Sequence, residues 1–114
     1  MIDTTEIGYE IFYAYGFITE DRFAKWREKP SSEDPKKTNE QYTIDQAEEK
    51  IAQGREEAVI CGIASLYDEW IETEKKYFAQ CQRGHAFDEE VEALQRKRLS
   101  LAQKVKLRSM GIAE

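Results

Sequence analysis

The chain has few of the residues that interrupt helices. Its 114 residues include only two prolines and six glycines, and both prolines, Pro30 and Pro35, fall in one short stretch. Because proline breaks a helix interior and glycine weakens it, the rest of the chain is free to form long helices. The composition therefore favours an all-α fold, and the length suits a single domain.

Cysteine and long apolar runs are also scarce. On one straight helix Cys61 and Cys81 would lie about 30 Å apart, too far for a disulfide, so both are expected to be reduced core residues. No apolar run approaches the roughly 20 residues of a membrane span, and residues 7–17 make a poor signal peptide. We expect a cytoplasmic protein without a membrane anchor.

Acidic charge is what the chain has in excess. It carries 23 acidic and 17 basic residues, a net charge of −6, which argues against general nucleic-acid binding because that binding relies on Lys and Arg. Basic residues gather only near the C-terminal end, at Arg96, Lys97, Arg98, Lys104, Lys106 and Arg108. A helical nucleic-acid accessory protein is therefore one alternative, although complementing a helix dipole and keeping the chain soluble is the better explanation of the cluster.

Four helices are predicted from capping signals and from the spacing of apolar residues. Asp3 followed by Glu6 resembles a capping box, and Gly16 supplies a stop after the first helix. Thr43 followed by Gln46 is a second capping signal. The predicted helices cover residues 4–15, 20–28, 44–82 and 88–110, with a flexible loop at 29–41.

The last two predicted helices form an antiparallel hairpin with unequal arms. Helix 44–82 would be about 58 Å long and helix 88–110 about 35 Å, so residues 44–58 overhang. Their apolar residues have the heptad-like spacing of a coiled coil: Ile44, Ala47, Ile51, Gly54, Ala58 and Cys61. The N-terminal helices or a second subunit must cover this stripe, unless the helix bends at Gly54 or Gly62.

Residues 58–64 are apolar on every side, which a two-helix hairpin cannot bury. This segment adds to the expectation of a homo-oligomer. A β-strand over residues 58–66 is the minor alternative, because the chain offers no second strand to pair with it.

Aromatic residues concentrate in the first 26 positions. A core beneath short helices would explain most of them, but aromatic side chains also dominate protein interfaces. We therefore predict a non-enzymatic interaction protein (an adaptor, assembly factor or small inhibitor) that binds a protein partner or a second copy, without a cofactor or catalytic residues. The residues expected to make contact are Tyr9, Phe12, Tyr13, Tyr15, Phe17, Ile44 and Ile51.

Paired carboxylates support an alternative function. Two i, i+3 pairs fall on neighbouring predicted helices, as in a Mg²⁺-dependent nucleotide hydrolase: Glu69, Glu72, Glu89 and Glu92. A solvated helix face explains them more simply, since Glu92 would lie opposite residue 76 in the hairpin. The single histidine, His85, is expected in an exposed loop.

Overall fold

The protein, described from a computed structural model, is all-α, as the sequence predicts. The structure describes residues 1–82 and 88–111, and this part of the chain contains no β-strand, so the alternative of a strand over 58–66 is wrong. No helix in it is both long and apolar enough to cross a lipid bilayer. The elements in order are α1 (Thr4–Tyr15), η1 (Phe17–Thr19), η2 (Asp21–Phe23), α2 (Ala24–Glu28), α3 (Asn39–Ile60), α4 (Ala64–Gln82) and α5 (Glu89–Ser109).

Helix α1 has the predicted bounds because its capping residues act as expected. The Asp3 carboxylate accepts a 3.0 Å hydrogen bond from the backbone N–H of Glu6, and the N–H of Gly16 closes the last turn on the carbonyl of Phe12 at 2.9 Å. The helix predicted at 20–28 is instead two 3₁₀ turns followed by the five-residue α2. The hydroxyl of Thr19 donates back to the carbonyl of Gly16 in the first of these turns.

Helix α3 begins five residues before the predicted start at residue 44. Thr38 is the N-cap, and its hydroxyl accepts a 3.1 Å hydrogen bond from the N–H of Gln41. Thr43, which the sequence suggested as the cap, is buried inside the helix and donates to the carbonyl of Asn39 at 2.7 Å. The loop therefore ends at residue 38, where Thr38 forms an isolated antiparallel bridge with Pro30.

The predicted helix 44–82 is two helices separated at Gly62. This glycine has a φ of +76°, a left-handed conformation that favours glycine, and it follows the last turn of α3. The N–H of Ile63 then closes back on the carbonyl of Ala58 at 2.8 Å. The bend therefore occurs at Gly62, while α3 runs unbroken through Gly54, and Cys61 is exposed at the turn rather than buried in the core.

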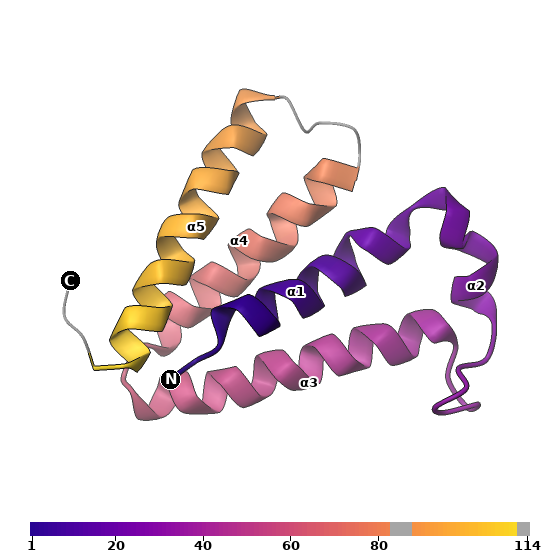
Figure 1. The fold of residues 1–114 in the computed structure, drawn as a ribbon, viewed down its shortest axis with the longest axis horizontal. Coiled ribbons are helices and arrows are strands. Elements are labelled where there is room, and N and C mark those ends of the chain that lie inside the picture. The colour runs from indigo at the N-terminus through magenta and orange to yellow at the C-terminus, as the bar shows by residue number, and fades with distance from the viewer. Residues whose placement is uncertain (83–87, 112–114) are drawn as a thin grey trace.

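The break changes how the helices pair. Figure 1 shows α4 and α5 side by side and running in opposite directions, so the arms are Ala64–Gln82 and Glu89–Ser109. Helix α1 packs along α3 and against α4, in the angle between them. It packs on the side of α3 where Ala47, Ile51, Gly54 and Ala58 of the apolar stripe are buried. The predicted overhang is thus resolved within one chain.

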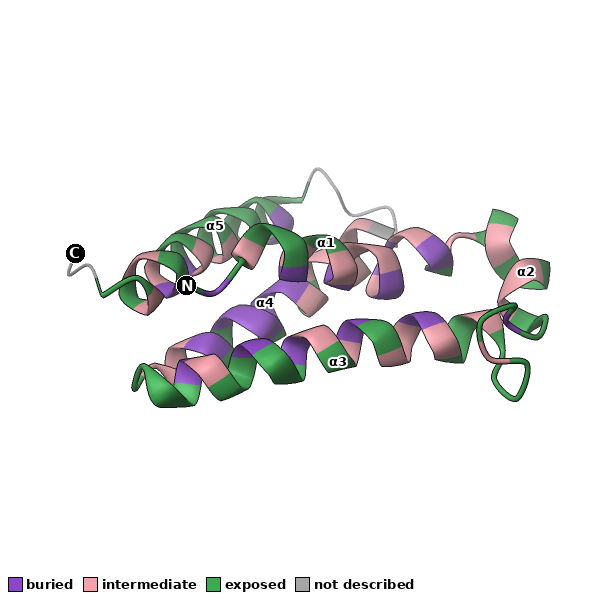
Figure 2. Ribbon diagram, turned by 60° about the horizontal axis from the view of Figure 1, so that its bottom comes forward, coloured by how far each residue is buried: buried purple, intermediate pink, exposed green. Residues whose placement is uncertain are grey.

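One core joins α1, α3, α4 and α5. Figure 2 shows buried residues along the sides of α1, α3 and α4 that face one another. Tyr67 and Trp70 are fully buried, with ring centroids 5.8 Å apart. The other buried members are Ile2, Ile7, Ile11, Ile51, Ala58, Ile71, Leu101 and Val105.

Candidate interaction surface

An unbroken series of aromatic rings runs from the middle of α1 to α2. Tyr13 stacks on Tyr9 with ring centroids 6.4 Å apart and on Phe17 at 5.7 Å. Phe23 lies 4.8 Å from Phe17 and 6.1 Å from Trp26. Aromatic pairs at these separations attract one another beyond their buried area, so the series is a preorganised surface rather than a set of independent side chains.

The two sides of α1 have different environments. Ile7 and Ile11 point into the core, whereas Tyr9 is 62% exposed. Phe12 and Tyr13 are half-buried, and the ring of Phe12 packs edge-on against Phe78 of α4 at 5.3 Å. The aromatic residues of α1 therefore extend the core on one side and emerge into solvent on the other.

Tyr9 and Tyr13 border a groove between α1, the loop and the first turns of α3, with a volume of about 420 Å³. We call this depression the aromatic groove. It combines three phenol rings with two carboxylates and a few neutral polar groups. Its lining residues are Tyr9, Glu10, Tyr13, Glu33, Tyr42, Thr43 and Gln46.

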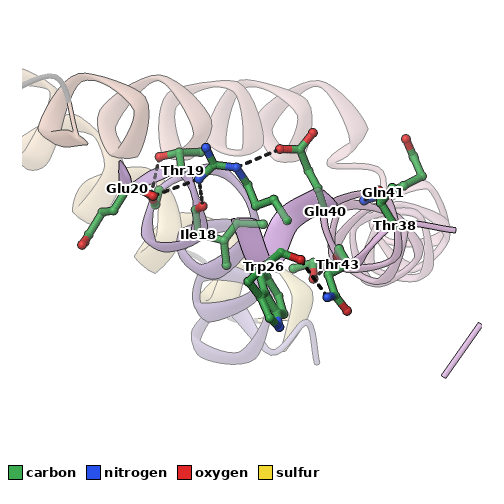
Figure 3. A network of polar contacts seen from close by, with 11 residues as sticks. Ile18, Thr19, Glu20, Trp26, Thr38, Glu40, Gln41 and Thr43 are labelled. Carbon is green, nitrogen blue, oxygen red and sulfur yellow. Dashed lines mark hydrogen bonds and ion pairs between the residues drawn. The ribbon is translucent and has the colours of Figure 1, made fainter. Parts of the chain in front are cut away.

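Arg27 fastens the segment between α1 and α3 to the rest of the molecule. Its guanidinium donates to the carbonyl of Ile18 and, at 2.9 Å, to that of Glu20, and it lies 3.2 Å from the Glu40 carboxylate (Figure 3). The Asn39 side chain adds a 2.8 Å hydrogen bond to a carbonyl of α2. These contacts fix the orientation of Phe23 and Trp26 relative to α3.

Tyr15 lies apart from the aromatic groove. Its hydroxyl donates to the carboxylate of Glu48 on α3, which also accepts a 2.8 Å hydrogen bond from Lys75 of α4. Burial alone would raise the pKa of Glu48, but the hydrogen bonds from Lys75 and Tyr15 hold it below its usual value. Burial and the same carboxylate raise the pKa of Tyr15. This polar bridge joins three helices.

The remaining predicted contact residues occupy other positions. Ile51 is buried in the core, and Ile44 is half-buried on α3. Phe17 belongs to the aromatic series, where the guanidinium of Arg22 lies 5.2 Å from the centroid of its ring. The structure thus brings Tyr9 and Tyr13 together at the groove, and it keeps Tyr15 and Ile51 away from it.

Five lining residues of the groove were not among the predicted contact residues: Glu10, Glu33, Tyr42, Thr43 and Gln46. Glu10 shares α1 with the predicted tyrosines, whereas Glu33 and Tyr42 fall in or beside the segment expected to be a loop. The only local signal was the capping pattern at Thr38, which would have put Tyr42 on a helix. Their meeting with α1 depends on tertiary packing.

A second exposed apolar area lies at the corner between α3 and α4. Val59 and Ile60 are 54% and 84% exposed, and Met110 at the end of α5 is also exposed. The end of α5 reaches this corner, since the Sγ of Cys61 lies 3.9 Å from the carbonyl oxygen of Ser109. Residues 58–64 are therefore only partly covered by the chain itself.

The carboxylates of the alternative metal site all point to solvent. Glu69, Glu72, Glu89 and Glu92 are exposed. In the described ranges 1–82 and 88–111, no group of three or more His, Cys, Asp or Glu side chains is arranged to hold a metal ion. His85 falls outside the described residues.

The basic residues of α5 do not all face solvent. Arg98 turns inward, where its Nε donates a 3.0 Å hydrogen bond to Glu74. Lys104 is half-buried, and the exposed members are Arg96, Lys97, Lys106 and Arg108.

In comparisons with known proteins, the chain matches no family model, no curated protein and no solved structure.

Proposed function

We propose that this chain is a non-enzymatic protein–protein interaction protein, an adaptor, assembly factor or small inhibitor that docks a partner in the aromatic groove. The observation that carries the proposal is the pair of stacked tyrosines, Tyr9 and Tyr13, at the edge of this groove. Tyrosine supplies a large contact area at low cost in conformational entropy, and it is enriched at binding hot spots.

The chemistry of the groove favours a basic partner segment. Glu10 and Glu33 line it together with three phenol rings, and both kinds of group attract Lys and Arg side chains. The surrounding charge has the same sign, since residues 1–82 carry 10 basic and 18 acidic residues. Long-range attraction would then speed the encounter with a basic partner and weaken as salt is added.

The test compares two sets of surface substitutions. Tyr9→Ser with Tyr13→Ser removes the tyrosine edge of the groove, and Ile60→Ser removes an exposed apolar side chain at the distant corner. A crosslinking pull-down from native lysate should recover a partner with the wild type and with Ile60→Ser, but not with the tyrosine variant. Recovery by the tyrosine variant would exclude the groove as the docking surface.

A direct titration tests the partner chemistry. Calorimetry with a Lys- and Arg-rich peptide should give saturable heat that weakens at high salt, while a Glu- and Asp-rich peptide of equal length should give none. Sedimentation across concentration identifies a second copy of the chain as the partner. A strict monomer that captures no specific protein and binds neither peptide would contradict the proposal.

A further inference from the structure

Glu74 of α4 is an acidic side chain held in the interior, with a relative exposure of 2%. Its Oε1 accepts two hydrogen bonds of 3.0 Å, one from the indole Nε1 of Trp70 and one from the Nε of Arg98. Its Oε2 is buried as well, yet it has no hydrogen-bond partner in the described part of the chain. Buried polar atoms are almost always paired, so this free acceptor requires an explanation.

The charges around Glu74 are already balanced. The guanidinium of Arg98 pairs with the carboxylate and also lies 4.6 Å and 4.9 Å from the ring centroids of Tyr77 and Phe78. Burial raises the pKa of Glu74, against the lowering effect of Arg98 and of the Trp70 hydrogen bond. The site therefore holds one fixed ion pair and one unused acceptor.

The free oxygen faces α1 at a glycine. A Cβ built on Gly8 would lie 3.7 Å from Oε2, an ordinary van der Waals distance, so no side chain separates the backbone of α1 from the oxygen. Glu74 and Gly8 line a pocket of about 320 Å³ between α1, α4 and α5. The mouth is accessible, since Tyr9 and Leu99 are 62% and 55% exposed.

The rest of the lining is divided by chemistry. Thr4 and Thr5 contribute polar side chains at the start of α1. Phe12, Phe78 and Ala102 contribute apolar surface from α1, α4 and α5. A ligand in this pocket would meet an acceptor at Glu74 and apolar walls beside it.

We propose that this pocket binds a small uncharged amphiphile, whose N–H or O–H group donates to Glu74 Oε2 while its apolar body packs against Phe12, Phe78 and Leu99. A cationic group would lie beside the guanidinium of Arg98, and an anionic group would face the free carboxylate oxygen. Because the Glu74–Arg98 pair is already neutral, a cation would leave the buried site with a net positive charge and an anion with a net negative charge. Either is costly, whereas a neutral donor pairs the oxygen at no such cost.

The indole N–H of Trp70 is a local reporter, because it shares the Glu74 carboxylate with the ligand. In ¹⁵N-labelled protein, the Trp26→Phe variant leaves one indole signal to follow. Benzamide, which carries an amide N–H on an aromatic ring, should shift that signal saturably. N,N-dimethylbenzamide lacks the donor and should shift it at least tenfold less at equal concentration.

Gly8→Ala is the variant that closes the site. Its added methyl group contacts no atom closer than 3.7 Å, so the protein should fold with an unchanged or higher melting temperature while the benzamide response is lost. Tyr13→Ser changes the aromatic groove at a residue that does not line this pocket, so it should keep the response and separates this test from that of the docking surface.

Three outcomes would overturn the proposal. The first is the absence of a saturable shift of the Trp70 indole signal with benzamide at millimolar concentration. That result would mean that only water forms a hydrogen bond with Glu74 Oε2. The second is an equal response in the folded Gly8→Ala variant. The third is tighter binding of benzylammonium than of benzamide, which would refute the preference for an uncharged ligand.

Discussion

The hydroxyl of Tyr67 donates a 2.7 Å hydrogen bond to the carbonyl of Ile51, joining α4 to the middle of α3. Both residues are buried, and the phenol ring lies against Gly54 one turn further along α3. This contact holds the two helices together after the chain reverses at Gly62, and it provides the first prediction.

Tyr67→Phe should lower the free energy of unfolding by about 1 kcal/mol, the usual net contribution of a hydrogen bond. The ring and its packing on Trp70 remain, so only the hydroxyl is tested. Urea denaturation measures the change. An unchanged midpoint would show that the hydrogen bond adds nothing to the α3–α4 junction.

Gly54→Ala should destabilise the protein by about 2 kcal/mol, although alanine is the better helix former. The new methyl group would lie 2.8 Å from Ile7 Cδ1 and 3.1 Å from Tyr67 Cζ, and closest of all to the tyrosine hydroxyl. Gly8→Ala is the matched control, because it has room. In the Tyr67→Phe background, Gly54→Ala should destabilise the protein less. If the effects of the two substitutions on the free energy of unfolding simply add, the tyrosine hydroxyl is not what the new methyl group clashes with.

Gly62→Ala should lower the free energy of unfolding by about 1 kcal/mol, and the cause should be backbone strain alone. A Cβ on Gly62 would meet nothing within 4 Å, but its φ of +76° is unfavourable for alanine. Gly62→Asn should cost less, since asparagine tolerates this conformation better. Thermal unfolding distinguishes the variants, and a stabilised Gly62→Ala protein would contradict the positive φ.

Glu74→Gln should change how stability depends on pH. Because burial raises the pKa of Glu74 above its ordinary 4.5, its favourable contribution is complete below the unfolded pKa and is lost as pH rises through the folded pKa. Relative to Glu74→Gln, the wild type should therefore lose stability as pH rises above the ordinary pKa of 4.5.

Urea denaturation at a series of pH values measures this difference. Only the change of stability with pH is compared, so the absolute cost of leaving Arg98 without its partner does not enter. Glu72→Gln, exposed on the same helix, controls for the removal of one negative charge. A wild type that gains stability relative to Glu74→Gln over this interval would mean that Arg98 outweighs burial.

Arg27→Ala should lower the free energy of local opening of the segment between α1 and α3 by about 2 kcal/mol, since it removes charged hydrogen bonds to two carbonyls. Amide hydrogen exchange should quicken over residues 17–28 more than in α4. Lys25→Ala, at an exposed position of the same short helix, is the control. Unchanged exchange in this segment would show that aromatic packing alone holds it.

The sequence by itself determined the helical class and the bounds of α1, because proline is confined to one stretch and capping depends on neighbouring residues. It also indicated the aromatic character of the N-terminal segment. It could not choose between Gly54 and Gly62 as the bend, since both glycines permit one locally. Tertiary packing decided, because Tyr67 and Ile7 need the space over Gly54 inside a straight helix.

In both proposed sites, some contacts follow from the sequence of one helix and others depend on tertiary packing. Tyr9 and Tyr13 are four residues apart on one helix, so their stacking follows from helix geometry. Tyr42 joins them only because α3 packs along α1. Glu74 can reach Trp70 within its own helix, but its pairing with Arg98 and its position under Gly8 join three helices far apart in sequence. Only the fold brings those groups together, since no local rule links them.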